Sequence, residues 1–320
     1  MTNYSLAIDI GGTFIKYAFV DKKLNIIYQW KKETKYFNTK NEFYDYLCEG
    51  IDNHNIDFIG VSAPGVISED SLVLSKAAKN VQIMYMTNIN KEIELRLKKP
   101  TFSLNDGKSA GYCELMIGNG KGSSSSVYFI IGTGIGGCIC YKDEIIQGVD
   151  RIAGEFSTLP IDFSPTKNGR FKRLAEIASI SALIKMYNAK SSIPLKTGEE
   201  ICNKYLNHDT LAQEIVHQWC KNIILGLSII IMLYNPEIIC IGGGISEEKW
   251  FIDKIQEIYI NETHIISDPL ITTKIKACKY NNNSNLLGAI LYAKKRLATS
   301  NNGSILKLEG KYILLQFSYI

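Results

Sequence analysis

The sequence lacks the patterns that would place it in several large classes of protein. Its 320 residues carry a formal net charge of only +4. Such a small excess favours neither a nucleic-acid nor a membrane-surface partner, although it suits a small anionic ligand. The most apolar stretch, Ile223–Leu233, is shorter than the roughly 20 residues that cross a bilayer. Because Met1–Tyr4 lead directly into a strand-like run, no signal peptide is predicted. We therefore expect a soluble, cytoplasmic protein.

The cysteines also lack the spacing of a metal site. None of the 8 cysteines forms a CxxC pair, which is half of many zinc sites. Several lie in apolar runs, as Cys240 does between two isoleucines. Cys138 and Cys140 are two apart in a strand-like segment, so both should point to the same side and pack there. We expect buried, reduced thiols of the kind found in cytosolic proteins.

Length and an internal similarity indicate two lobes. A chain of 320 residues, with 46% hydrophobic and 21% charged residues, is a globular protein too long for one typical core. Two segments about 120 residues apart share one layout, a pattern that suggests two related lobes facing each other. Each has an apolar strand, a glycine turn carrying a threonine, and a second apolar strand. The segments are 5–10, 11–13 and 14–20, then 127–131, 132–137 and 138–141.

Hydrophobic periodicity predicts most of the remaining elements. Helices are expected at 90–98, 176–186, 211–233 and 247–259, and strands at 58–62, 102–104 and 238–241. Ser246 is expected to cap the helix that follows it, because Glu247 and Glu248 would lie in its first turn. Residues 299–303 have the polar composition of a loop, and residues 311–320 resemble a late strand.

Glycine turns matter because phosphate oxygens need several backbone N–H groups at close range, where side chains would block the approach. The GxxxxGK[ST] pattern of the P-loop is absent. Gly132-x-Gly134 is followed by a strand, whereas a dinucleotide fingerprint opens a helix. A single glycine hairpin is explained by turn geometry alone. Two such hairpins, each at the end of a buried strand, favour nucleotide binding.

Two carboxylates stand at predicted strand ends. Asp9, separated from the first glycine turn by one residue, is either a turn cap or a group that contacts Mg²⁺ or its water shell. Asp106 lies between a strand and a helix. It is either a helix N-cap or a general base that takes the proton from an attacking hydroxyl.

Taken together, these motifs resemble the ROK family in order and spacing, from about Leu6 to Ala298. The motifs are Asp9–Thr13, Asn105-Asp106, Gly132–Gly137, Gly154-Glu155 and Ile241–Gly244. This family comprises bacterial sugar kinases and related repressors. The resemblance implies an α/β protein of the two-lobed, actin-like ATPase (ribonuclease H-like) fold with a cleft between the lobes. Residues 1–115 and a helix at about 285–298 would form one lobe and residues 116–284 the other. Residues 299–320 would be a tail of unknown role.

The resemblance also implies a role for each matched position. Asp106 would be the catalytic base, and ATP and Mg²⁺ would be required, with Asp9 as the carboxylate linked to the metal. Asn80, Asn105 and Glu155 would contact the sugar. The phosphate-binding turns would be Gly11, Gly12 and Thr13 together with Gly132, Thr133 and Gly134, and the turn beside the adenosine would be Gly242, Gly243 and Gly244. A homodimer is the usual habit of the family.

This chain departs from the family pattern in the sugar half of the site. Many members continue from Gly-Glu into a histidine and a CxCGxxGC zinc motif, but here neither a histidine nor a cysteine follows Glu155. No zinc site is expected, and Ser157 or Thr158 would stand near the place of the histidine. The next sugar-binding glutamate would be Glu176, although an ungapped match puts Ala175 there. Lys108 replaces a small or amide residue, and its role is open.

The activity implied by the resemblance is transfer of the γ-phosphate of ATP to a hexose or hexosyl hydroxyl, taken to be O6. Members without the zinc motif include β-glucoside kinases and N-acetylmannosamine kinases, so the sugar could be glucose, N-acetylmannosamine or a β-glucoside. Two alternatives remain. One is a sugar-responsive repressor, which would carry a helix-turn-helix domain ahead of the first glycine turn, where this sequence has eight residues before Asp9. The other is a catalytically silent, sugar-binding paralogue.

Overall fold

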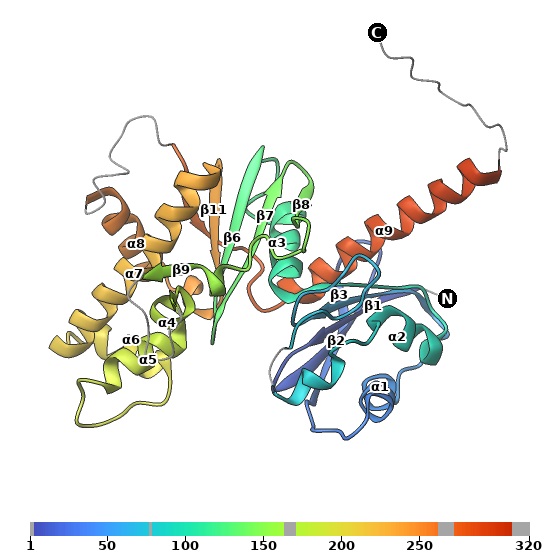
Figure 1. The fold of residues 1–320 in the computed structure, drawn as a ribbon, viewed down its shortest axis with the longest axis horizontal. Coiled ribbons are helices and arrows are strands. Elements are labelled where there is room, and N and C mark those ends of the chain that lie inside the picture. Colours follow the sequence, from blue (N-terminus) through green and yellow to red (C-terminus); the bar gives the residue numbers. More distant parts are fainter. Residues whose placement is uncertain (1–2, 77–78, 163–170, 262–271, 309–320) are drawn as a thin grey trace, which may run out of the picture.

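Two five-stranded sheets form the framework of the molecule (Figure 1). The computed structural model describes residues 3–76, 79–162, 171–261 and 272–308, with side chains as far as residue 300. The strand orders are β3-β2-β1-β4-β5 and β12-β11-β6-β7-β8. In each sheet, an antiparallel hairpin continues into parallel strands: β1 pairs antiparallel with β2 and parallel with β4, and β6 pairs antiparallel with β7 and parallel with β11. This confirms the predicted repetition and the two-sheet α/β fold.

The first sheet buries one face under short helices. Its strands are β1 (Tyr4–Ile10), β2 (Phe14–Val20), β3 (Ile26–Glu33), β4 (Ile56–Ala63) and β5 (Thr101–Asn105). The helices α1 (Lys40–Cys48) and α2 (Ile89–Leu97) and the 3₁₀ helix η1 (Lys79–Met84) share a hydrophobic core with these strands. Thr39 and Glu42 form a capping box at the start of α1, which satisfies two backbone N–H groups that would otherwise lack partners.

Two helices, α3 (Asp106–Ile117) and α9 (Ser284–Leu308), connect the sheets. α9 packs on β1 and β4, while α3 packs on β6 and β7 of the other sheet and on α9 itself. Gly288 allows the close approach of the two helices, because a Cβ atom there would lie 1.8 Å from the Ser109 carbonyl oxygen. Figure 1 shows α3 beside β7 and the start of α9 next to α3. Helix α3 is therefore held against the second sheet directly and against the first sheet through α9.

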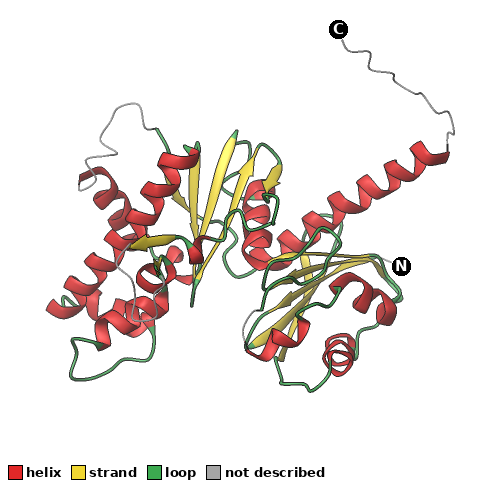
Figure 2. Ribbon diagram, in the orientation of Figure 1, coloured by secondary structure: helices red, strands yellow, loops and turns green. Residues whose placement is uncertain are grey.

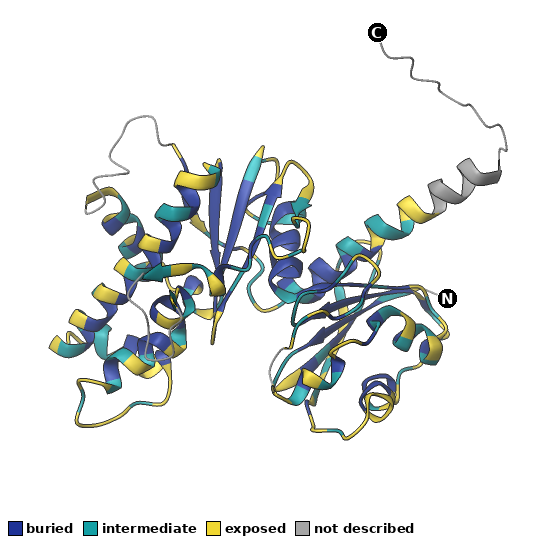
Figure 3. Ribbon diagram, in the orientation of Figure 1, coloured by how far each residue is buried: buried dark blue, intermediate teal, exposed yellow. Residues whose placement is uncertain are grey.

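The second sheet carries a layer of helices on its outer face (Figure 2). Its strands are β6 (Ser125–Ile131), β7 (Ile135–Tyr141), β8 (Glu144–Ile146), β11 (Ile238–Gly242) and β12 (Lys274–Ala277). The helices are α4 (Ala175–Ala178), α5 (Ile180–Asn188), α6 (Gly198–Leu206), α7 (Thr210–Tyr234) and α8 (Lys249–Asn261). The short elements are η2 (Phe156–Thr158), η3 (Gly244–Glu247), β9 (Pro160–Asp162) and β10 (Lys172–Arg173). Figure 3 shows that β6 and β11 are largely buried beneath these helices.

Helix α7 is the central helix of this second core. Among the described residues it alone is long and apolar enough to cross a membrane, and 56% of its most apolar window is buried inside the protein. Trp219 is fully buried and donates from its indole nitrogen to the carbonyl oxygens of Ala178 and Ser179, at 3.0 and 3.1 Å. Packing in the core accounts for the apolar composition of this helix.

Three sequence-based predictions of local structure are wrong. The helix predicted at 176–186 is divided into α4 and α5, because Ser179 has an extended backbone and caps α5 by accepting from the Ala182 N–H. Ser246 does not cap α8: it lies in η3, and its hydroxyl donates to the Gly243 carbonyl oxygen. The loop predicted at 299–303 is helical, since α9 continues to Leu308.

Other predictions are confirmed or stay open. All eight cysteines are buried and free, and the sulfur atoms of Cys138 and Cys140 lie 3.5 Å apart on the same side of β7. Among the described residues no group of three or more His, Cys, Asp or Glu side chains could hold a metal, and the expected absence of a zinc site stays a prediction. The late strand predicted at 311–320 lies outside the described residues. The lobe boundaries at 115 and 284 stay a prediction.

Candidate active site

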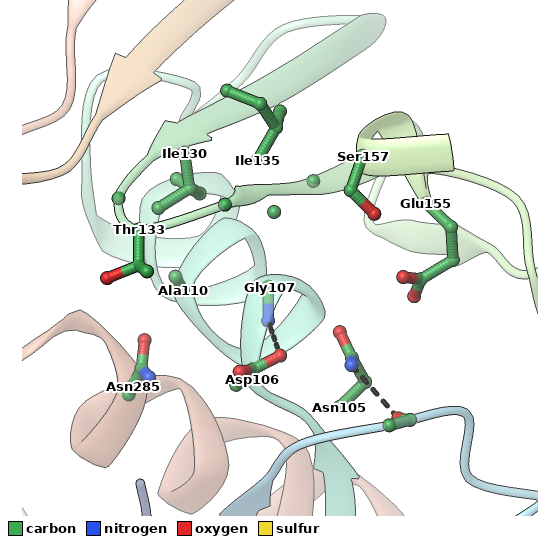
Figure 4. Close-up of a pocket in the computed structure, with 15 residues that line it drawn as sticks. Asn105, Asp106, Gly107, Ala110, Ile130, Thr133, Ile135, Glu155, Ser157 and Asn285 are labelled. Carbon is green, nitrogen blue, oxygen red and sulfur yellow. Dashed lines mark hydrogen bonds between the residues drawn. The ribbon is translucent and has the colours of Figure 1, made fainter. Parts of the chain in front are cut away.

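A cavity of about 540 Å³ lies between residues that follow β4 and β5 of the first sheet and the β6–β7 turn of the second. Side chains and backbone from the start of α3, the β6–β7 turn, η2 and α9 surround it (Figure 4). Among the residues that line it are Asn105, Asp106, Gly132, Thr133, Gly134, Glu155, Ser157 and Asn285. The cavity thus brings together the base, one glycine turn and three of the sugar-binding residues that the sequence predicts.

Asp106 is the first residue of α3, but it is not the N-cap. Asn105 has that role, because its side-chain oxygen accepts from the Lys108 N–H at 3.1 Å. The Asn105 amide also donates to the Gly65 carbonyl oxygen at 3.0 Å, which fixes the end of β5. The Asp106 carboxylate accepts from the adjacent Gly107 N–H at 2.8 Å and faces the cavity. Capping therefore does not explain an aspartate at position 106.

The environment of Asp106 makes it a stronger proton acceptor than an ordinary aspartate. Burial raises the pKa of Asp106 to about 6, and the hydrogen bond from Gly107 opposes part of this increase. The negative charges of Asp9 and Glu155 act in the same direction as burial and contribute to this pKa of about 6. A carboxylate with a pKa of about 6 is still ionised at neutral pH and can accept a proton from a hydroxyl.

The β6–β7 turn presents backbone to the cavity. Gly132, Thr133 and Gly134 are exposed and line it. A Cβ atom added to either glycine would meet no protein atom within 4 Å, and neither glycine has a positive φ. Neither packing nor backbone geometry therefore requires glycine here. The Gly132 N–H donates to the Gly134 carbonyl oxygen at 3.0 Å within the turn, and the open space at the Cβ positions of both glycines leaves room for an anion to approach the backbone closely.

A close backbone approach places Asp106 beneath this turn. A Cβ atom on Gly107 would lie 2.8 Å from the backbone nitrogen of Gly137, so only glycine lets the first turn of α3 touch β7. This contact brings the predicted base and the predicted phosphate turn into one cavity.

Asp9, at the end of β1, is connected to the same cavity through Asn285. One oxygen of the buried carboxylate accepts from the Ser62 hydroxyl at 2.8 Å and from the Asn285 amide at 3.0 Å. Asn285, the second residue of α9, itself lines the cavity and was missed by sequence reasoning. The sequence indicates only that a carboxylate at the end of an apolar strand needs hydrogen-bond donors. No local pattern shows that Asn285 supplies one of them.

The first glycine turn is held in place from outside the cavity. The Thr34 hydroxyl donates to the Gly11 carbonyl oxygen at 2.7 Å, and the Thr34 N–H donates to the Thr13 carbonyl oxygen at 2.9 Å. The amide of Asn80, in η1, donates to the Gly12 carbonyl oxygen. Gly11, Gly12, Thr13 and Asn80 are not among the residues that line the cavity. Their predicted contacts with phosphate and sugar stay a prediction.

Glu155 and Ser157 line the wall of the cavity that lies across from Asn285 (Figure 4). Gly154, with φ of 85°, turns the chain, and buried Phe156 stacks on Phe129 at a ring distance of 5.7 Å, which fixes the residues on either side. Burial raises the pKa of Glu155, while the nearby Lys108 cation lowers it. Of the two residues predicted near the place of the family histidine, Ser157 lines the cavity, and Thr158 donates its hydroxyl to the Glu155 carbonyl oxygen at 3.0 Å.

The remaining predicted positions lie elsewhere. Glu176 is exposed and accepts from the Arg173 N–H at 3.0 Å, and neither Glu176 nor Ala175 lines the cavity. Gly242 and Gly243 are required by packing: Gly243 has φ of 94°, and a Cβ atom there would lie 1.9 Å from the Ile131 carbonyl oxygen.

Gly244 lines a second cavity. It has a volume of about 380 Å³ and is bounded by η3, the start of α5 and α6, with Ile180, Gly198 and Ile245 in its wall. The Ile180 N–H donates to the Gly132 carbonyl oxygen at 3.0 Å. The second cavity is therefore joined to the exposed glycine turn by a direct backbone contact.

Residues 5–296 match the ROK family. The chain belongs to the ROK family. A β-glucoside kinase from Listeria innocua is 29% identical over 292 residues, which cover 89% of this chain and 96% of the relative. An N-acetylmannosamine kinase from Haemophilus influenzae is 23% identical and covers 94% of this chain and 98% of the relative.

Solved structures of ROK proteins have the same fold. A ROK protein from Streptococcus pneumoniae, in complex with sucrose, superposes with a TM-score of 0.82 at 22% identity and covers 92% of this chain and 99% of its own. A ROK glucokinase from Streptomyces griseus, in complex with glucose and AMPPNP, gives a TM-score of 0.75 at 22% identity over 92% of this chain and 100% of its own. The predicted actin-like ATPase fold is thereby confirmed.

Proposed function

We propose that this ROK protein is an ATP-dependent sugar kinase in which Asp106 is the general base. One observation carries the proposal: Asp106, with a pKa raised to about 6, shares a cavity with the exposed Gly132–Gly134 turn. Phosphoryl transfer needs little covalent help from the protein, so a positioned base and a set of donors facing the phosphates can suffice. Relatives named as sugar kinases support the same conclusion.

In the proposed reaction the acceptor hydroxyl, taken as O6 of a hexose or hexosyl group, lies between Asp106 and the γ-phosphate. Asp106 accepts the hydroxyl proton as the oxygen–phosphorus bond forms and the bond to the β-phosphate oxygen breaks. Backbone N–H groups of the exposed glycine turn would stabilise the charge on the phosphate oxygens. Closure of the two lobes over the sugar would exclude water, which could otherwise accept the phosphoryl group.

The sugar would be held by polar side chains that line the cavity beside and across from Asp106. Asn105, Glu155 and Ser157 offer both donors and acceptors, which suits sugar hydroxyls because each hydroxyl both donates and accepts. The family resemblance also assigns sugar contacts to Asn80 and Glu176. Neither residue lines the cavity, so closure of the lobes would have to move them towards the sugar.

ATP would lie across both cavities. Its phosphates would face the glycine turns, Gly11–Thr13 and Gly132–Gly134, and its adenosine would enter the second cavity beside Gly244. A Cβ atom on Gly244 would meet nothing within 4 Å, so this position is open to a ligand as well.

Asp9 fits a role in holding Mg²⁺. Mg²⁺ prefers carboxylate oxygens and is usually held by one or two carboxylates together with substrate phosphates. Asp9 offers a carboxylate whose orientation is fixed by Ser62 and Asn285, and Asn285 lines the cavity. When bound, the ion would neutralise charge on the phosphates.

The sugar can be identified by a coupled assay of ADP release. The panel is glucose, mannose, N-acetylmannosamine, fructose and the β-glucoside cellobiose, with ATP and Mg²⁺. We expect sugar-dependent ADP release with at least one of them. ADP release with none, despite binding of a sugar, would instead identify a catalytically silent or regulatory paralogue. A homodimeric assembly and a cytoplasmic location complete the proposal.

A further inference from the structure

Lys108 is a buried lysine behind the wall of the proposed sugar site, in contact with Glu155, which lines the cavity. Lys108 lies two residues after Asp106 in the first turn of α3, and its side chain is only 2% exposed. Burial lowers the pKa of Lys108, as expected for an ammonium group removed from water. Burying a cation is costly unless it has partners, so the contacts of its ammonium group should explain its presence.

The ammonium group has two partners, and both belong to the segment that ends at Glu155. The Lys108 Nζ atom donates to the Arg151 carbonyl oxygen and lies 3.7 Å from the Glu155 Oε1 atom. The Glu155 side chain, in contrast, is 28% exposed and lines the cavity. Lys108 therefore contacts Glu155 from the protein side, while the carboxylate remains open to a ligand.

The segment that carries Glu155 needs such an anchor. Gly148, Arg151 and Gly154 all have positive φ, at 73°, 59° and 85°, and for Arg151 this backbone conformation is unfavourable. Lys108 binds the carbonyl group of Arg151, the residue with the unfavourable backbone. One side chain thus links the turn of α3 that carries Asp106 to the segment that presents Glu155.

We propose that Lys108 is a positioning residue for sugar binding: it holds the Glu155 carboxylate directed into the cavity as an acceptor for sugar hydroxyls. Because the negative charge of Glu155 raises the pKa of Asp106, the position of the Glu155 carboxylate also bears on the proposed base. This inference rests on the proposed function, since it assigns a role within the same site.

A double-mutant cycle on sugar affinity separates this role from a purely structural one. Lys108→Met keeps the length of the side chain and removes its charge. It should weaken binding of the sugar that the wild type binds, from the panel of glucose, mannose, N-acetylmannosamine, fructose and cellobiose, by roughly 10- to 100-fold. The KM for ATP should change by less than about two-fold, because the Lys108 ammonium group contacts Arg151 and Glu155 and Lys108 is not part of the cavity lining.

In the Glu155→Gln background the same Lys108→Met change should weaken sugar binding by less than about three-fold, since the partner carboxylate is gone. Lys254→Met, which removes a cation paired with Glu257 on α8, is the matched control and should leave sugar binding unchanged. Should Lys108→Met fail to fold, Lys108→Gln retains a donor for the Arg151 carbonyl and should weaken binding about ten-fold.

Calorimetry of sugar binding distinguishes failure of this inference from failure of the proposed function. Equal loss of affinity in both backgrounds, or wild-type affinity in Lys108→Met, would overturn the positioning role even if the enzyme is an active kinase. If the wild type binds a sugar without releasing ADP, the kinase proposal fails and the cycle still tests Lys108. If it binds no sugar of the panel, both are overturned.

Discussion

Replacement of Asp106 by asparagine should remove the base with little change in the shape of the site. The wild-type carboxylate accepts from the Gly107 N–H at 2.8 Å, and the amide oxygen of asparagine can accept the same bond. Asn105 caps α3 in either case, so the helix should begin at the same residue. The substitution therefore removes the capacity to accept a proton while leaving the hydrogen bonds in place.

The expected loss follows from the role of a general base. Such groups accelerate reactions by roughly 10²- to 10⁴-fold, so kcat of Asp106→Asn should fall by at least about 100-fold. The KM for sugar should stay within about three-fold of the wild-type value, because Asn105, Glu155 and Ser157 still line the cavity. A coupled ADP assay and calorimetry of sugar binding measure the two quantities separately.

The pH dependence of the wild type provides an independent check. The base must be deprotonated to work, and its pKa is raised to about 6, so kcat/KM for sugar should be constant at neutral pH and fall below about pH 6. At pH 5 it should be roughly one tenth of its value at pH 7.5. Near-normal kcat in Asp106→Asn, or an acid limb near pH 4, would refute the assignment of the base.

Further measurements, at Asp106 and at other positions, test the physical basis of these assignments. In the wild type the pKa of Asp106 is about 6 in the folded state and 3.8 ordinarily, so the free energy of unfolding falls by about 3 kcal/mol as the pH rises from below 3.8 to above 6. Asparagine carries no charge and avoids this loss. Asp106→Asn should therefore be more stable than the wild type at neutral pH, with a higher melting temperature. Gly132→Ala should raise the KM for ATP at least several-fold with an unchanged melting temperature, because its Cβ meets no protein atom. Gly243→Ala, in contrast, should destabilise the protein by several kcal/mol in denaturant titrations, since its Cβ would collide with the Ile131 carbonyl oxygen. Glu114→Gln should lower stability by about 2 kcal/mol or more, because this fully buried carboxylate accepts from the backbone N–H groups of Asn119, Lys279 and Tyr280.

Local patterns were enough to predict the framework of the fold. Each hairpin is encoded by two apolar strands around a short glycine turn, and strand pairing follows directly from that arrangement. The register of the hairpins places both turns at strand ends, where ligand sites are expected. The alternation of strands and helices then leaves few ways to complete each sheet.

Single polar residues inside helical patterns were harder to interpret. Ser179 divides one apolar run into two helices by capping the second, although the periodicity continues through it. Residues 299–303 are polar, yet α9 continues through them, because composition is a weak guide at a helix end.

Long-range contacts of the site could not be read from the sequence. Asn285 donates to Asp9 across 276 positions, and Lys108 reaches Arg151 across 43. The pKa of Asp106 depends on burial by both sheets and on Asp9 and Glu155, whose proximity exists only in the folded chain. The Gly132–Gly134 turn, which lines the cavity, could be located from the sequence because a glycine turn is local, while the surroundings of Asp9 and Glu155 depend on these distant contacts.

The measurement that tests the central claim most directly is phosphorus NMR of the product formed by the wild-type protein from ATP, Mg²⁺ and each sugar of the panel. The account predicts a sugar phosphate esterified at O6, formed together with ADP and only when the sugar is present, and absent at matched times with Asp106→Asn. Formation of ADP without a sugar ester, or no turnover of any sugar in the panel, would contradict it.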